Sequence, residues 1–191
     1  MWHNCYVSRV CIINNKGRLR LSKLFDQRKS SAPLIAREKN SMPQQMNQEQ
    51  VRNLLRHIDA TLDETVKMDI FTQLGHECFH CNHLDQWIDG FKGDVQKFLD
   101  NINVQHQSVY WESLVLSADK SQLILTGKEV DECACPFADC SAPPLSLCNY
   151  CCKSFQEEIF KTLFGKQVEV TITESYLWGN RRCNTVIEIS R

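Results

Sequence analysis

Cysteine is the residue that most constrains what this chain can fold into. Eleven of its 191 residues are cysteines, and seven lie in the last 60 residues. An odd number excludes complete intramolecular pairing, and in a reducing compartment thiols at this density are typical of metal ligands or redox groups. The sequence therefore predicts a metal or redox site in the C-terminal half, whereas a secreted chain would favour disulfides. The seven are Cys133, Cys135, Cys140, Cys148, Cys151, Cys152 and Cys183.

The spacing of these cysteines indicates zinc. Cys133 and Cys135 form a C-x-C, and Cys148 and Cys151 form a C-x-x-C at the start of a predicted helix. A helix N-terminus stabilises a thiolate and lowers its pKa. Zinc takes four ligands in a tetrahedron, at about 2.3 Å for sulfur, so two such pairs would complete one site. In the alternative interpretation, Cys152 and Cys183 are small buried hydrophobic residues.

A second cysteine cluster lies between residues 75 and 83. Cys78 and Cys81 form another C-x-x-C, with His76 and His80 beside them. These groups would bind zinc alone or complete the C-terminal site. The alternative is that Cys78 packs in the core, because it continues an apolar stripe from Leu74, while the histidines face solvent.

Helical periodicity begins near Asn47, where Asn47 and Gln50 resemble a capping box. The stripe ends at Gly75 or just beyond, and Asp59 with Thr61 could divide it into two helices. Its apolar members recur at steps of three and four residues; they are Val51, Leu54, Leu55, Ile58, Leu62, Val66, Ile70 and Leu74.

The remaining pattern predicts a helix over Asp94–Ile102, a β-hairpin over 109–126, a helix over Asn149–Phe164, and strands over Gln167–Thr173 and Asn184–Ser190. Gly165 follows the last helix, where a C-terminal glycine belongs. The expected fold is α+β: N-terminal helices packed on an antiparallel sheet of about four strands, with a cysteine-bearing helix before the last two strands.

The N-terminal region differs from the rest in charge. Residues 1–41 hold nine Lys or Arg and two Asp or Glu, against thirteen and twenty-one in residues 42–191. We expect residues 1–46 to be a basic, disordered arm with a short hairpin around Asn14–Gly17, or a consequence of a start assigned too early. Residues 47–191 would be one cysteine-rich domain. Without aromatic interleaving or a helical face, the arm is not expected to bind nucleic acid.

Membrane and export signals are not evident in the sequence. No run of about 18 apolar residues occurs, and residues 1–15 have neither a long apolar segment nor a small-residue cleavage site. We therefore expect a cytoplasmic protein without a membrane span.

The C-terminal segment Cys148–Ile189 resembles the C-terminal motif of the 4-vinyl reductase (hydrocarbon-binding) domain. The shared features are the cysteine-bearing helix, a G-x-x-V-x-V strand at Gly165–Val170, then Glu174, and Gly179–Cys183. The match extends to a related cysteine-rich bacterial family of uncharacterised function. That family adds a C-x-C before the helix, as at Cys133–Cys135, and a G-x-x-C at a helix end, as at Gly75–Cys78.

The resemblance implies a small-molecule-binding domain in which zinc is held by cysteines and a glutamate. Carried over by position, Cys151, Glu174 and Cys183 are ligands. The family cysteine just after the glutamate is absent, since 175–177 are Ser, Tyr and Leu, and Cys133, Cys135 or Cys148 would supply the missing ligand.

The leading functional prediction is a small-molecule-binding or sensing domain with zinc in a cysteine site and no turnover. A small apolar molecule would enter a pocket lined by Phe155, Ile159, Tyr176 and Trp178. The alternatives are a thiol- or metal-dependent enzyme and a redox thiol switch. No Ser-His-Asp order, H-E-x-x-H or phosphate loop is present, so the reaction of an enzyme could not be named.

Overall fold

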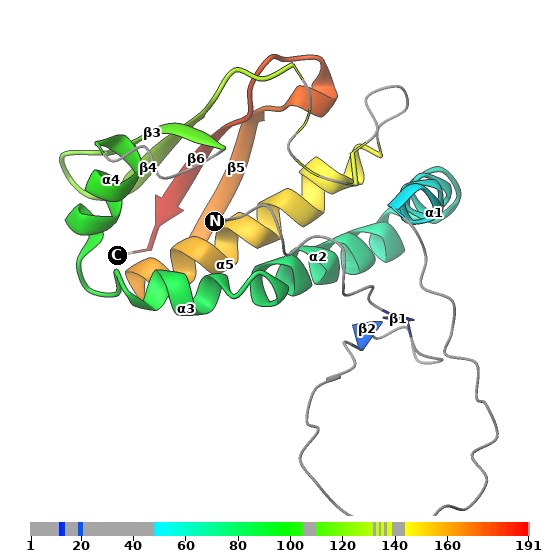
Figure 1. Ribbon diagram of the computed structural model, residues 1–191, viewed down its shortest axis with the longest axis horizontal. Helices are drawn as coiled ribbons and strands as arrows, with labels where there is room; N and C mark the ends of the chain where they lie inside the picture. The colour runs from blue at the N-terminus through cyan, green and yellow to red at the C-terminus, as the bar shows by residue number, and fades with distance from the viewer. Residues whose placement is uncertain are drawn as a thin grey trace, which may run out of the picture.

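The computed structural model describes residues 12–13, 19–20, 48–104, 110–131, 133, 135, 137–138 and 144–190. It is an α+β structure in which helices pack on one face of a four-stranded antiparallel sheet (Figure 1). The predicted fold class is therefore confirmed, including the cysteine-bearing helix before the last two strands. Cys140, Asn47 and most of the basic arm lie outside the described residues.

In the N-terminal region the structure describes one short antiparallel pair, β1 (Ile12–Ile13) with β2 (Leu19–Arg20). This pairing agrees with the expected hairpin. The proposed division between residues 46 and 47 stays a prediction.

The long apolar stripe forms two helices. The first, α1 (Gln48–Thr61), ends just before the second, α2 (Glu64–Cys81). Asp63 starts α2, because its carboxylate accepts a hydrogen bond from the Val66 backbone N–H at 3.1 Å. The helix continues six residues past Gly75, where the sequence predicted its end. Gly75 is instead an interior position at which another helix approaches.

Two shorter helices follow. The sequence did not predict α3 (Leu84–Asp89), which is only six residues long. The helix expected over 94–102 is present as α4 (Val95–Asn103), and Asp94 caps it by accepting from the Lys97 N–H at 3.0 Å.

The sheet contains β3 (Trp111–Leu116), β4 (Gln122–Gly127), β5 (Val168–Glu174) and β6 (Asn184–Ile189) in the order β3-β4-β6-β5. All neighbouring strands are antiparallel, with Leu125 opposite both Leu114 and Thr185. Both predicted strand pairs are present. The alternation of apolar residues set their inward face, since successive side chains point to opposite sides of a sheet.

The C-terminal helix begins irregularly. Residues Leu147–Cys152 form a π-helical segment, η1, which continues into α5 (Lys153–Phe164). Gly165 ends α5 in the left-handed conformation, at φ 64°, as the sequence predicted. Single π-helical turns often occur at functional sites, and this one carries Cys148, Cys151 and Cys152.

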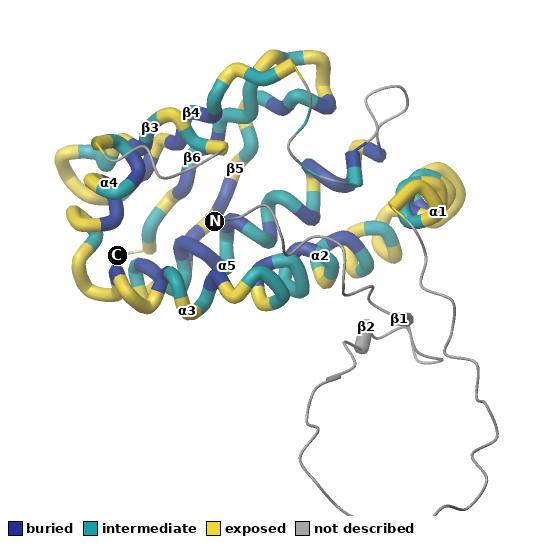
Figure 2. The backbone as a smooth tube through the Cα atoms, viewed as in Figure 1, coloured by how far each residue is buried: buried dark blue, intermediate teal, exposed yellow. Residues whose placement is uncertain are grey.

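Two apolar clusters make up the core, and Figure 2 shows buried residues along the strands and along α5. The first fills the space between the sheet, α3, α4 and α5, with Phe98 and Phe160 fully buried. The second lies where α1, α2, η1 and the loop after β5 meet, with Phe71 and Leu147 fully buried. The cysteines of the C-terminal half that are described belong mainly to the second cluster.

Candidate thiol site

The site is built on a close crossing of α2 and η1 at Gly75. A Cβ atom at this position would lie 2.3 Å from the Cys151 carbonyl oxygen and 2.0 Å from the Ser154 Oγ. Ser154 reinforces the crossing by donating a hydrogen bond from its hydroxyl to the Thr72 carbonyl at 2.9 Å. Only glycine permits this approach, and it brings Cys78, one turn further along α2, to Cys151.

Cys78 and Cys151 form a hydrogen-bonded thiol pair. The Cys151 S–H donates to the Cys78 sulfur, which lowers the pKa of Cys78 despite the opposing effect of burial. The same hydrogen bond, followed by burial, raises the pKa of Cys151 well above its usual value. The pair therefore separates into a thiolate-prone Cys78 and a proton-holding Cys151.

A second pair, Cys148 and Cys152, lies one turn apart on η1. The Cys152 S–H donates to the Cys148 sulfur, and this bond is the main reason that the pKa of Cys148 is lowered. The Ser175 hydroxyl also donates to Cys148, at 2.9 Å, and the Leu177 backbone N–H assists. The pKa of Cys152 is raised well above its usual value, first by the bond to Cys148 and then by burial.

These directions partly correct the expectation for the C-x-x-C motif. A low pKa was predicted for thiols at the helix start, and Cys148 has one, because sulfur, hydroxyl and backbone donors surround it. Cys151 has the opposite shift, because its sulfur is the donor to Cys78 and lies in an apolar interior.

The loop before η1 adds Cys133 and Cys135 to the second apolar cluster. Burial raises the pKa of Cys135 to about 12, and negative charge on Cys133 or Cys78 would raise it in the same direction. Cys135 also influences the pKa of Cys151 and of Cys152. The loop thus places at least one sulfur beside both thiol pairs.

Cys183 approaches from the segment before β6. Its sulfur accepts a hydrogen bond from the Tyr176 backbone N–H at 3.4 Å, and burial is the main cause of its raised pKa. Gly127 makes room for this segment, because a Cβ there would lie 2.3 Å from the Cys183 carbonyl oxygen. Charge on Cys148 acts on Cys183 as well, so Cys183 adjoins the Cys148 side of the group.

We refer to these seven residues together as the thiol cluster. Its members come from α2, the loop before η1, η1 itself and the segment before β6. They are Cys78, Cys133, Cys135, Cys148, Cys151, Cys152 and Cys183.

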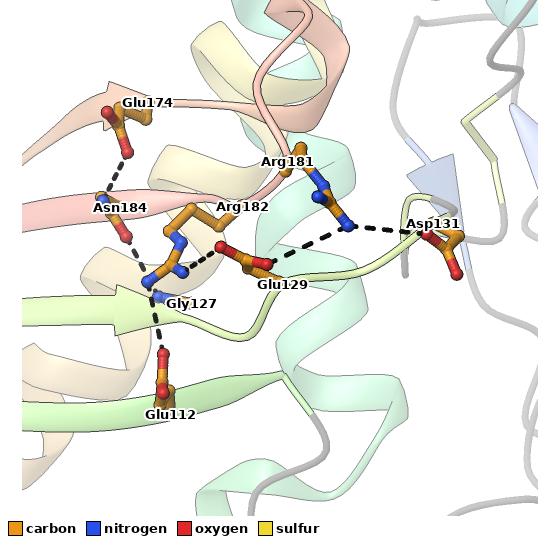
Figure 3. A network of polar contacts seen from close by, with 8 residues as sticks. All are labelled: Glu112, Gly127, Glu129, Asp131, Glu174, Arg181, Arg182 and Asn184. Atoms are coloured by element: carbon orange, nitrogen blue, oxygen red, sulfur yellow. Dashed lines mark hydrogen bonds and ion pairs between the residues drawn. The ribbon is translucent and has the colours of Figure 1, made fainter.

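Glu174 is engaged elsewhere. The Asn184 amide donates to its carboxylate, and the Asn184 side-chain oxygen accepts from the Gly127 N–H at 3.2 Å (Figure 3). Asn184 shares its face of β6 with exposed Glu188, opposite the buried Thr185. Glu174 therefore lies on the open face of the sheet, in the neighbourhood of an ion-pair network in which Arg182 bridges Glu112 at 3.3 Å and Glu129 at 2.6 Å.

Of the second cysteine cluster predicted from the sequence, Cys78 is the residue that joins the thiol cluster. His76 pairs with Glu158 across 3.2 Å, between Nδ1 and Oε1. His80 is exposed, with an edge contact to the neighbouring Phe79 ring. Cys81 is partly buried at the end of α2. Of the two cysteines in this C-x-x-C, Cys78 interacts with Cys151 of η1.

The four residues predicted to line a pocket do not lie in one environment. Ile159 is buried in the first apolar cluster and Phe155 packs against it. Tyr176 packs against the second cluster, and the side chain of Trp178 is exposed. A shallow surface hollow of about 400 Å³ lies elsewhere, beside α3 and α4, with Trp87 and Phe91 in its lining.

Chemically, the thiol cluster consists of pairs. In the described ranges, no three Cys, His, Asp or Glu side chains are grouped closely enough to hold a metal ion. What the arrangement provides directly is two thiol pairs, Cys78 with Cys151 and Cys148 with Cys152, each with one cysteine whose pKa is lowered. A tetrahedral site would need further approach of the sulfurs.

Sequence reasoning left two alternatives open for Cys78, a separate zinc site or a part of the C-terminal site, and it interpreted Cys152 as a core residue. The periodicity held a signal for Cys78, because four residues separate it from Leu74 on the inward stripe. For Cys152, the four-residue separation from Cys148 on a predicted helix is the corresponding signal.

Comparisons with known proteins give no family. The sequence matches no protein-family model and no curated protein. Among solved structures, the chain is similar to an H-NOX protein from S. oneidensis in the Fe(II)NO ligation state, with 13% identity, a TM-score of 0.46, and coverage of 81% of this chain and 83% of that one. It is also similar to trafficking protein particle complex subunit 3 from Naegleria fowleri covalently bound to palmitic acid, with 9% identity, a TM-score of 0.36, and coverage of 76% and 83%. Likenesses this distant define neither a ligand nor a function.

No described helix combines the length and the apolar character that crossing a membrane requires.

Proposed function

We propose that this chain is a small-molecule-binding or sensing domain whose functional element is the thiol cluster, and that the cluster takes up zinc. The observation that supports this is the convergence of sulfurs from four segments of the chain, with hydrogen bonds that favour the thiolate at Cys78 and at Cys148. Thiolates are the form in which cysteine binds metal.

The ligand set favoured by these contacts differs from the one that the resemblance implied. Cys78, Cys135 and Cys151 affect one another's ionisation in every pairing. Cys148 or Cys152 would supply the fourth sulfur, since Cys148 raises the pKa of Cys151 and Cys151 raises the pKa of Cys152. Zinc would draw the pairs together into a tetrahedron with Zn–S distances of about 2.3 Å. Glu174 is not part of this proposed set, because Asn184 holds it on the open face of the sheet.

Zinc uptake by this set would release protons. Burial and hydrogen bonding raise the pKa of Cys135, Cys151 and Cys152, so these thiols hold their protons at neutral pH until a metal displaces them. Zinc affinity is therefore expected to rise steeply with pH.

The sensing part of the proposal rests on the resemblance of 148–189 to the 4-vinyl reductase motif. A small apolar molecule is the ligand that this resemblance implies.

The decisive experiment is the metal content of the full chain, purified without oxygen and reduced. About one zinc per chain is expected, lost in Cys151→Ser and retained in Glu174→Gln. If zinc were lost in Glu174→Gln and retained in Cys78→Ser, the ligands would be those implied by the 4-vinyl reductase resemblance and not the set proposed here. A fully reduced chain that neither carries zinc nor takes it up would overturn the proposal.

A further inference from the structure

We propose that two copies of this chain join through β5, the strands of the two copies lying antiparallel and making one continuous sheet. The contact uses no cysteine, so it is independent of the proposed metal site. Three features of the molecule support it: the hydrogen bonding of the two sheet margins, the residues of β5, and the charges at the two ends of that strand.

The outer edge of β5 carries backbone groups without a recorded partner among the described residues. In the described ranges, β5 pairs with β6 alone and forms one margin of the sheet (Figure 1). Just before the strand, the Ser190 N–H donates to the Gln167 carbonyl at 3.0 Å. Residues of an antiparallel pair alternate between bonding the neighbouring strand and facing away from it. The N–H and carbonyl groups of Val168, Val170 and Ile172 therefore point outward.

The opposite margin of the sheet is closed by a side chain. Leu114 of β3 turns its N–H and carbonyl outward, and the Asn103 amide at the end of α4 bonds both of them at 2.7 Å. A further strand therefore cannot pair with β3 at this point. Open strand edges pair readily with other strands, so the contrast identifies β5 as the margin at which a strand can add.

The residues of β5 favour such pairing. Five of the seven in Val-Glu-Val-Thr-Ile-Thr-Glu are β-branched, a class of residue that packs well in sheets. Natural edge strands commonly resist pairing through lysine, proline or a very short length, and β5 has none of these. Val168 and Val170 are buried in the first apolar cluster, which holds the strand in place before a partner arrives.

A register centred on Val170 uses every outward group. Val170 then lies opposite Val170 of the second copy, and Val168 lies opposite its Ile172, so each outward N–H meets a carbonyl across the junction. On the open face of the sheet, Glu169 lies opposite Thr171 of the second copy. Like charges directly opposite each other destabilise a strand pair, and this register avoids them.

The two ends of the junction are oppositely charged. The same register brings Lys166 of each copy beside Glu174 of the other. Lys166 is exposed, and Glu174 lies on the open face of the sheet, where the Asn184 amide holds its carboxylate. A two-fold axis repeats the contact at the other end. This charge complementarity favours a second copy over an unrelated extended segment.

The test is the mass of the full, reduced chain, measured by sedimentation equilibrium over a range of concentrations. Reduction excludes dimers that are linked by disulfides. We expect a concentration-dependent dimer with twice the mass of one chain. Amide hydrogen exchange at Val168, Val170 and Ile172 should slow as the dimer forms, because these N–H groups become hydrogen-bonded only across the junction.

Charge variants test the register. Thr171→Glu places a carboxylate opposite Glu169 at both symmetric contacts and should weaken the dimer about tenfold. Adding Glu169→Lys to it should restore the dimer, because opposite charges then face each other. The matched control is Val115→Glu. Val115 is 57% exposed and belongs to the row of opposite residues that ends at Thr171, so the control adds the same charge to the same face at the other margin and should leave the dimer unchanged.

A monomer at every concentration would overturn the inference, including a monomer whose β5 edge binds an extended segment of another protein. A dimer that keeps its affinity in Thr171→Glu, or loses it in Val115→Glu, would also overturn it, because the contact would then lie elsewhere. Circular dichroism checks that each variant is folded. If Thr171→Glu does not fold, hydrogen exchange of the unaltered chain decides, since outward amides of β5 that exchange equally fast at every concentration would refute the junction.

Discussion

Replacing Gly75 with alanine tests the helix crossing that supports the thiol cluster. The new Cβ would lie 2.3 Å from a backbone oxygen of residue 151, a contact that no side-chain rotation can relieve. Overpacking of this kind costs about 1–3 kcal/mol, and the backbone contact places this site near the upper end. Alanine returns about 1 kcal/mol of helix propensity. The expected net loss in unfolding free energy is about 2 kcal/mol.

Urea denaturation of the reduced chain, followed by circular dichroism, measures this loss. With a slope of about 2 kcal/mol per molar urea, the midpoint should fall by about 1 M. The variant should also alkylate more slowly at Cys78, because the hydrogen bond from Cys151 would be lost.

Two controls isolate the cause. Gly90→Ala adds a Cβ whose nearest heavy atom, the Trp87 carbonyl oxygen, lies 3.3 Å away, so its effect should stay within about 0.5 kcal/mol. Adding Ser154→Ala to Gly75→Ala removes only the 2.0 Å contact with the hydroxyl, and most of the loss should persist. A midpoint for Gly75→Ala that is unchanged or raised would refute the crossing as described.

Three further perturbations test polar contacts that hold elements of the fold in place. Asn103→Ala should cost about 1–3 kcal/mol in thermal or urea unfolding, because the Asn103 amide bonds both the N–H and the carbonyl of Leu114 at 2.7 Å; an unchanged midpoint would contradict this. Asp59→Ala should lower the free energy of unfolding by about 1–2 kcal/mol, since the Asp59 carboxylate accepts from the Leu145 N–H at 3.1 Å and from the Ser146 N–H and hydroxyl at the start of η1. Asp59→Asn should lose only part of this free energy. Hydrogen bonds from the Ser117 and Ser121 side chains lower the pKa of Asp119 to about 2. The stabilising contribution of its carboxylate is therefore complete above the unfolded pKa of about 4 and is lost as the pH falls towards 2. Carboxyl NMR titration should show the lowered pKa, and a value near 4 would contradict the turn geometry.

The sequence by itself determined most of the secondary structure and the class of fold. Period-two alternation in Val168–Ile172 and in 184–189 defined strands with one buried face, and period-3.6 stripes defined α4 and α5. The glycine that predicted a helix end was correct at Gly165, where the chain is exposed. These patterns are readable because the preference they express is local: which face of an element is apolar, and which residue tolerates a left-handed turn.

The tertiary structure decided what the cysteines do. Gly75 read as a helix end because glycine disfavours helices locally, yet a neighbouring helix requires the space that its missing side chain leaves. That crossing pairs Cys78 with Cys151, although 73 positions separate them in the sequence. Spacing along the chain could indicate that thiols are abundant near η1. It could not indicate which sulfur donates to which, because hydrogen bonding and burial around each thiol are set by segments distant in sequence. The opposite pKa shifts of Cys78 and Cys151 are a property of that packing.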